Sequence, residues 1–290
     1  MDIQQLRIFQ SIVECGSMVQ AATKLHCVPS NVTIRIKKLE EELKAPLFLR
    51  EGKTLKLTAS GEVFLEYCEK ILALCDEAKR SIHPDSAPSG PLRIGAIESS
   101  ATTRLPRLLA KYHQRYPDVS IQITTGTWKQ LLQDVLQHKL DGAIVAGQIQ
   151  FPLLHKLEIY KENMVLIAPA SLGEIKCQED LIDKEIFMWT EGCPYRAALE
   201  EWLNLKNLSL PITGITSYAT IIGCVSAGSG VSLVPQSIFE QYKIMTNICG
   251  YQFTQLASMQ NQFLWHQNIQ HHKAREAFIE LLKAEFSNKK

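Results

Sequence analysis

Polar and cationic side chains recur over residues 29–41, and the first acidic residue among them is Glu40. Apolar residues recur in the same stretch at steps of four, three and four, as expected for one buried helix face: Val32, Ile36, Leu39 and Leu43. The opposite side carries groups suited to phosphates and base edges: Ser30, Asn31, Thr33, Arg35 and Lys38. A solvated amphipathic helix would show the same pattern, so the flanking sequence has to separate the two interpretations.

The flanking residues predict a compact helical module. Ser17 followed by Gln20 fits a capping box, and Pro29 suits the first position of the next helix. A short helix, a tight turn and a second helix with a polar face favour a helix-turn-helix. The apolar residues that would pack it together are Leu6, Phe9, Ile12, Val13, Ala21, Ala22 and Leu25.

Residues 45–57 predict a small hairpin, or wing, whose tip would place Arg50 and Lys53 against a phosphate backbone. Thr58 is expected to cap a long helix over residues 58–82. Its apolar residues alternate in steps of three and four, which indicates a dimer seam: Phe64, Tyr67, Ile71, Leu74 and Ala78. A helix packed only on its own domain is the alternative. Residues 83–91 are typical of an interdomain linker.

The charged residues are distributed unevenly between the two parts of the 290-residue chain. Net charge is only +1, yet residues 1–60 hold nine Lys and Arg against six Asp and Glu, while the remainder is slightly acidic. A basic module joined to an acidic one fits DNA binding by the first alone. We expect a cytoplasmic protein without a membrane segment, whose eight scattered cysteines are reduced thiols.

An ordered set of residues runs through the first 61 positions: Leu6 with Phe9, Gly16-Ser17, Ala21-Ala22, Leu25, Val32-Thr33, Ile36, Leu39-Glu40, Leu47-Phe48 with Arg50, and Leu57-Thr58 with Gly61. With this set, the first 61 residues resemble the N-terminal module of the LysR-type transcriptional regulators. One departure concerns the start of the recognition helix, where the family usually has Ser or Thr followed by Gln. Here Val28 and Pro29 stand, so a helix cap and one candidate base contact are absent.

From Leu92 the sequence alternates between strands and helices, which predicts an α/β region with parallel βαβ units. This half resembles the family's effector-binding domain, which is similar to a two-lobed periplasmic binding protein. The implied domains are a winged helix-turn-helix at 1–60 and an effector domain at 91–290. Lobe one would be 91–162 with 268–290, and lobe two 163–267.

In parallel sheets, ligands bind beyond the carboxyl ends of the strands. This rule and the family resemblance select Glu98, Ser99, Ser100, Thr125, Gly126, Trp128, Gly147, Cys193, Tyr195 and Tyr218 as effector-binding candidates. Many of these residues suit plain caps and turns equally well. Glu98 is a poor neighbour for an anion and favours a cationic or neutral effector. A cationic amine or diamine is the sharper hypothesis, although Glu98 also suits a local helix cap.

Other reactive residues suggest rival functions. Cys193 precedes an expected helix N-terminus, where a thiolate would be stabilised, so a redox-responsive regulator or a Cys193-dependent hydrolase are alternatives. Adjacent His271 and His272 point to different helix faces and do not suit a shared metal. Gly228-Ser229-Gly230 is expected to form a turn rather than a nucleotide loop.

The sequence therefore predicts a ligand-responsive regulator and not an enzyme, with no cofactor or metal. The resemblance implies double-stranded promoter DNA as partner, a homodimer through the long helix and a homotetramer. An effector held between the lobes would shift the population of oligomer arrangements on DNA. A solute-binding protein is disfavoured by the N-terminal module and by the absence of a signal peptide pattern.

Overall fold

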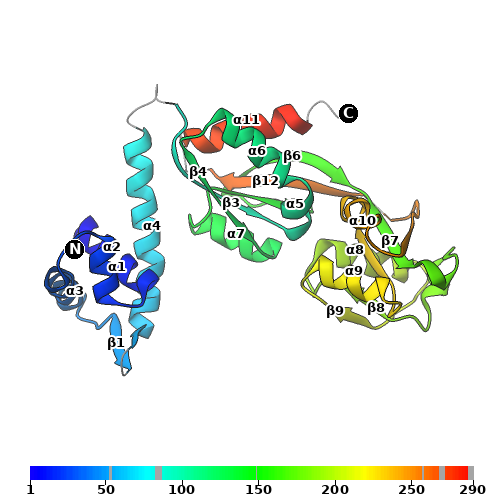
Figure 1. Ribbon diagram of the computed structural model, residues 1–290, viewed down its shortest axis with the longest axis horizontal. Helices are drawn as coiled ribbons and strands as arrows, with labels where there is room; N and C mark the ends of the chain where they lie inside the picture. The colour runs from blue at the N-terminus through cyan, green and yellow to red at the C-terminus, as the bar shows by residue number, and fades with distance from the viewer. Residues whose placement is uncertain (52–53, 82–86, 148, 257, 268–271, 287–290) are drawn as a thin grey trace. The chain divides into compact units, whose positions relative to one another are not determined.

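The structure is a computed structural model that describes residues 1–51, 54–81, 87–147, 149–256, 258–267 and 272–286 (Figure 1). The chain divides into two compact units, one formed largely by residues 1–86 and the other largely by residues 87–290. Within the described residues, no helix has the length and apolar character needed to cross a membrane.

The first unit is a three-helix module followed by a hairpin and a long helix. Its elements are α1 (Ile3–Cys15), α2 (Met18–Lys24), α3 (Pro29–Leu43), β1 (Phe48–Glu51), β2 (Thr54–Leu57) and α4 (Ala59–Ser81). The two strands pair antiparallel, as the wing prediction requires. Phe9 lies at the centre of the core, with its ring 5.2 Å from that of Phe48 and 5.0 Å from that of Phe64. The hairpin and α4 are thus fastened to α1 by aromatic packing.

Two close contacts fix the wing against its neighbours. The Glu40 carboxylate accepts the backbone N–H groups of Leu47, at 2.7 Å, and Phe48, at 3.2 Å, which ties α3 to the start of the hairpin. Thr58 caps α4 as predicted, because its hydroxyl oxygen accepts the N–H of Gly61 at 2.9 Å. A Cβ at residue 61 would lie 2.2 Å from the carbonyl oxygen of Leu47, so only glycine permits this approach.

The N-terminus of α2 differs from the sequence prediction, whereas that of α3 agrees with it. Ser17 precedes α2, but its side chain makes no capping hydrogen bond there, so the predicted capping box with Gln20 is wrong. The capping box belongs to α1, where the Asp2 side chain accepts from the N–H of Gln5 and the Gln5 side chain accepts from the N–H of Asp2. Burial of Ala21 and Ala22 holds α2 in place of a cap. At the start of α3, Val28 gives no side-chain cap, as expected.

The long helix α4 divides its predicted seam between two faces. Phe64 and Ile71 pack against the core of the helix-turn-helix unit, whereas Tyr67 and Leu74 are 59% and 51% exposed. The exposed apolar stripe runs instead through Val63, Tyr67 and Leu74 and continues to Ala78. Ile71 therefore serves the fold of its own unit, because α4 needs one apolar face to close the core.

This division yields a prediction about assembly. Leu74→Asp should place a charge in the expected contact between two α4 helices and dissociate the oligomer without unfolding the unit. Ile71→Asp should instead lower the free energy of unfolding by about 1–3 kcal/mol, because it buries a polar group. Sedimentation velocity and thermal unfolding of both variants separate the two effects, with Val19→Asp, at an exposed position on α2, as the control. An unchanged sedimentation coefficient for Leu74→Asp would place the interface elsewhere.

Lobe one of the second unit is a five-stranded sheet with the strand order β4-β3-β5-β12-β6. Its strands are β3 (Gly90–Ala96), β4 (Val119–Thr125), β5 (Gly142–Ala146), β6 (Leu154–Glu162) and β12 (Met259–His266). β3 pairs parallel with β4 and β5, whereas β12 pairs antiparallel with β5 and β6. Helices α6 (Leu105–Arg115) and α11 (Lys273–Phe286) cover one face, and α7 (Trp128–Leu136) covers the other (Figure 1).

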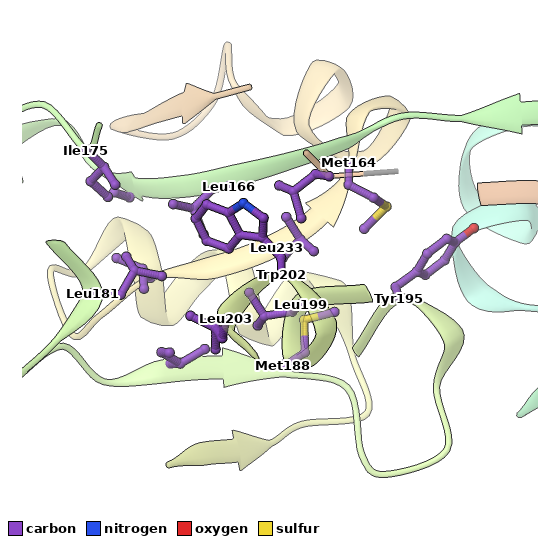
Figure 2. Packing of buried hydrophobic residues seen from close by; sticks show 14 of the residues in the cluster. Met164, Leu166, Ile175, Leu181, Met188, Tyr195, Leu199, Trp202, Leu203 and Leu233 are labelled. Carbon is purple, nitrogen blue, oxygen red and sulfur yellow. The ribbon is translucent and has the colours of Figure 1, made fainter. Parts of the chain in front are cut away.

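Lobe two is built on an antiparallel sheet, β10-β7-β11, with a parallel pair, β8 and β9. The strands are β7 (Met164–Pro169), β8 (Ile186–Met188), β9 (Ile212–Gly214), β10 (Ser232–Pro235) and β11 (Ile248–Tyr251). The helices are α8 (Pro194–Asn204), α9 (Tyr218–Ser226), α10 (Gln236–Tyr242) and two short 3-10 turns, Ala170–Leu172 and Gln178–Leu181. Figure 2 shows the core, where Trp202 of α8 lies among Leu166, Leu233 and Leu203.

Two expectations about the second unit need correction. The chain returns to lobe one at β12, so lobe two ends before Met259 and not at residue 267. The strands of lobe two are not a series of parallel βαβ units, because β7 pairs antiparallel with both β10 and β11. The pairing of β12 between β5 and β6 explains the first error, since this strand completes a sheet begun more than 100 residues earlier.

Candidate effector cavity and DNA-contacting helix

A cavity of about 90 Å³ lies between the two lobes of the second unit. The ends of β3 and β4 and the start of α7 supply one wall, and the segments that lead into α8 and α9 supply the other. Seven of the predicted effector-binding residues line it: Glu98, Ser99, Gly126, Trp128, Cys193, Tyr195 and Tyr218.

Three predicted residues do not line the cavity. Ser100 is 1% exposed, and its hydroxyl is hydrogen-bonded to that of Tyr160 at 2.7 Å. Thr125 is exposed at the end of β4. The carbonyl oxygen of Gly147 accepts from the Gln262 amide at 2.9 Å, which commits it to the sheet. Ser100 and Gly147 therefore have structural roles, and Thr125 faces solvent outside the cavity wall.

The cavity is also lined by residues outside the ten effector-binding candidates, most of which flank those candidates: Ile97, Thr127, Lys129, Ala146, Trp189, Thr190, Glu191, Gly192 and Pro194. Trp189 is the most informative of them. It directly follows β8, so the same rule on strand ends would have selected it. Its indole N–H is buried and has no hydrogen-bond partner among the described residues.

Glu98 is half-buried at the start of the short helix α5 (Glu98–Thr103). Its Oε1 accepts the backbone N–H of Tyr218 at 3.3 Å, so the carboxylate meets the N-terminus of α9 in the opposite lobe. Burial raises the pKa of Glu98 above its ordinary value, and the hydrogen bond from Tyr218 offsets part of that rise. Glu98 is thus a cap, but for a helix of the other lobe rather than for its own.

Aromatic side chains line the same cavity as this carboxylate. The rings of Trp189 and Tyr218 lie 5.5 Å apart at 60°. Trp128 donates its indole N–H to the carbonyl oxygen of Gly192 at 2.7 Å, a second hydrogen bond that joins the two lobes. A cavity that combines a half-buried carboxylate with electron-rich aromatic rings is suited to bind a cation.

Cys193 immediately precedes α8, as predicted, but the desolvation of its sulfur disfavours the thiolate. Backbone N–H groups of Tyr195 and Arg196 favour the thiolate, yet burial outweighs them and raises the pKa of Cys193. The helix terminus is thus less important here than the loss of water around the sulfur.

A buried ion pair lies near the point where β6 passes into β7. Glu162 is 4% exposed at its side chain, and its Oε2 accepts from Arg104 at 3.1 Å. Its Oε1 accepts the N–H of Ser237, at the start of α10, at 3.0 Å. The Arg104 guanidinium also lies 5.0 Å from the centroid of the Tyr160 ring. Glu162 therefore joins a residue of lobe one to a helix of lobe two.

In the first unit, α3 presents the predicted polar set on its surface. Ser30, Asn31 and Lys38 are exposed, and Thr33 and Arg35 are half-buried. The Arg35 guanidinium donates to the Asn31 side chain at 3.0 Å and lies 3.5 Å from the Asp2 carboxylate. The predicted wing contacts cannot be placed: Lys53 lies outside the described residues, and so does the side chain of Arg50.

Comparison with known proteins assigns this architecture. A family described as "LysR substrate binding domain" matches residues 85–287, and one described as "Bacterial regulatory helix-turn-helix protein, lysR family" matches residues 3–62. The chain belongs to the LysR family of DNA-binding transcriptional regulators. Among its relatives, the regulator GltR of Bacillus subtilis is 40% identical over 84% of this chain and 82% of its own length.

Other LysR relatives agree in sequence and fold. The regulator YusT of Bacillus subtilis is 37% identical over 91% of this chain and 89% of its own length. A full-length OxyR variant from Pseudomonas aeruginosa superposes with a TM-score of 0.76 at 21% identity, covering 98% of this chain and 95% of its own. Full-length CbnR in complex with its target DNA has a TM-score of 0.73 at 20% identity, covering 98% and 99%. At these identities, the two solved structures establish the fold alone.

The raised pKa of Glu98 gives a prediction for the ligand-free protein. The folded state holds the Glu98 proton to a higher pH than the unfolded chain does, so this group lowers stability as pH rises from about 4.5 through its folded pKa. Glu98→Gln keeps a carbonyl oxygen for the Tyr218 N–H but cannot ionise. The melting temperature of the variant relative to wild type should therefore rise across that interval and stay constant above it. If the melting temperatures of the variant and the wild type differ by a constant amount from pH 4 to pH 8, Glu98 is not desolvated in the folded protein.

Proposed function

We propose that this regulator changes its binding to promoter DNA, in the cytoplasm, in response to a small cationic effector held between its two lobes. The single observation that carries this proposal is the half-buried Glu98 carboxylate in a cavity walled by Trp128, Trp189 and Tyr218. Removing a carboxylate from water is costly unless a charge partner replaces the lost solvation. An ammonium or guanidinium group supplies that partner through a charge-assisted hydrogen bond.

The remaining charges of the cavity are compatible with this assignment. Lys129 and Glu191 also line it, but both side chains are exposed, so solvent screens them more than Glu98. The Lys129 ammonium lies 5.9 Å from the centroid of the Trp128 ring. The buried indole N–H of Trp189, which has no hydrogen-bond partner among the described residues, is a donor for one acceptor atom on the effector. A small amine, diamine or amino acid meets these requirements better than a simple carboxylate.

The mechanism that follows is a shift between lobe arrangements. An effector cation that pairs with Glu98 competes with the Tyr218 N–H for the same carboxylate, and this N–H belongs to the other lobe. Binding therefore stabilises one lobe arrangement over another by the difference in these contacts. We propose that the protein acts as a homodimer through α4 and as a homotetramer, and that the lobe change alters how its α3 helices meet the promoter. No catalytic step is assigned, because desolvation raises the pKa of the Cys193 thiol and so disfavours the thiolate.

Isothermal titration calorimetry of the full-length protein with putrescine-like diamines, arginine and simple carboxylates tests the effector class. An amine should bind best, and Glu98→Gln should weaken it by about 1.5–3 kcal/mol, the range for a hydrogen bond to a charged group. Glu191→Gln is the matched control, since it removes a screened carboxylate from the same cavity and should change affinity by less than about 1 kcal/mol. Preferential binding of a carboxylate, or equal effects of the two substitutions, would refute the cationic effector.

A further inference from the structure

The helix α3 exposes one large aliphatic side chain, that of Ile34. Its side chain is 65% exposed, whereas Val32, Ile36 and Leu39 of the same helix are fully buried and Leu43 packs against the core. Ile34 is two residues from Val32 and two from Ile36, and successive helix residues turn by about 100°. It therefore lies about 160° from each of them and occupies the middle of the outer face.

The neighbours of Ile34 on that face are polar or cationic. Ser30 and Lys38 lie one turn before and one turn after it, and both are exposed, as is Lys37. No Asp or Glu occurs between Val28 and Leu39, so the strip is free of negative charge. An aliphatic group framed by cations and a hydroxyl matches the major groove, where phosphates flank base edges.

We propose that Ile34 contacts the 5-methyl group of a thymine in each half-site and so sets part of the operator preference. The thymine methyl group is the apolar feature that the major-groove edge of a base pair displays. In a helix-turn-helix, the outer face of the second helix enters that groove, which leaves Ile34 facing base edges when DNA is bound. This inference rests on DNA binding through α3 and is independent of the effector proposed for the cavity.

A second exposed aliphatic side chain lies at the start of α3. Val28 makes no side-chain cap to the helix and is itself 62% exposed. Val28 is therefore the natural competitor for the role of Ile34 and needs its own variant.

The experiment begins with the full-length protein and a pool of random duplexes, from which the preferred sites are selected and sequenced. Each thymine of the best duplex is then replaced in turn by deoxyuridine, which lacks only the methyl group. At one thymine of each half-site the wild type should lose about fourfold in affinity, the ratio that corresponds to about 0.8 kcal/mol for one buried CH₂ group. Ile34→Ala should bind the thymine and deoxyuridine duplexes equally at that position.

Three control variants separate this role from a general loss of binding. Val19→Ala, at an exposed aliphatic position on α2, should retain the fourfold methyl dependence. Lys38→Ala should weaken both duplexes alike, because a phosphate contact carries no sequence information. If Val28→Ala abolishes the methyl dependence and Ile34→Ala preserves it, or if deoxyuridine has no effect at any position, Ile34 is not the reader. If Ile34→Ala retains the full methyl dependence, the proposal is also overturned, and the exposed Ile34 side chain would instead suit contact with a protein partner.

Discussion

Two carboxylates of lobe one cap the N-termini of two helices of lobe two, and the effector-binding unit depends on this arrangement. Glu98 accepts an N–H at the start of α9, and Glu162 accepts an N–H at the start of α10. Helix N-termini have N–H groups without partners inside the helix, so each lobe would otherwise leave polar groups unsatisfied. The same two contacts differ in their surroundings: Glu162 is paired with Arg104, whereas no guanidinium of the described residues pairs with Glu98, which lines the cavity. Both carboxylates thus join the lobes, but only the charge of Glu162 is already paired.

Much of this architecture could be read from the sequence because it follows simple periodicities. The apolar steps in α3 and α4 identify a helix-turn-helix with a long helix, and the apolar runs of β3 and β5 identify a sheet. The rule that ligands bind at the carboxyl ends of strands then found Glu98, Trp128 and Tyr218, which meet in one cavity although they are far apart in the sequence. These features are local in sequence or follow from the geometry of parallel strands.

The errors arose where tertiary contacts override local pattern. The strand β12 begins with polar residues, and Asn261 and Gln262 are fully buried. The Gln262 amide donates to the carbonyl oxygens of Gly147 and Ile149, so burial is satisfied by backbone groups that no periodicity reveals. Ile34, in contrast, falls outside the three-and-four spacing of Val32, Ile36 and Leu39, so its outward position follows from the sequence, and the structure adds its exposure of 65%.

The late position of β12 in the chain has a consequence for synthesis of the protein on the ribosome. β12 lies between β5 and β6 in the sheet of lobe one, and α11 covers that sheet from residues later still. Lobe two, in contrast, begins and ends on neighbouring strands, since β7 pairs with β11. The inserted lobe can therefore fold while the surrounding lobe still lacks the strand that joins β5 to β6, and the facing edges of these two strands stay unpaired until β12 emerges. Chaperone protection during that interval would matter most for lobe one, because unpaired strand edges promote aggregation.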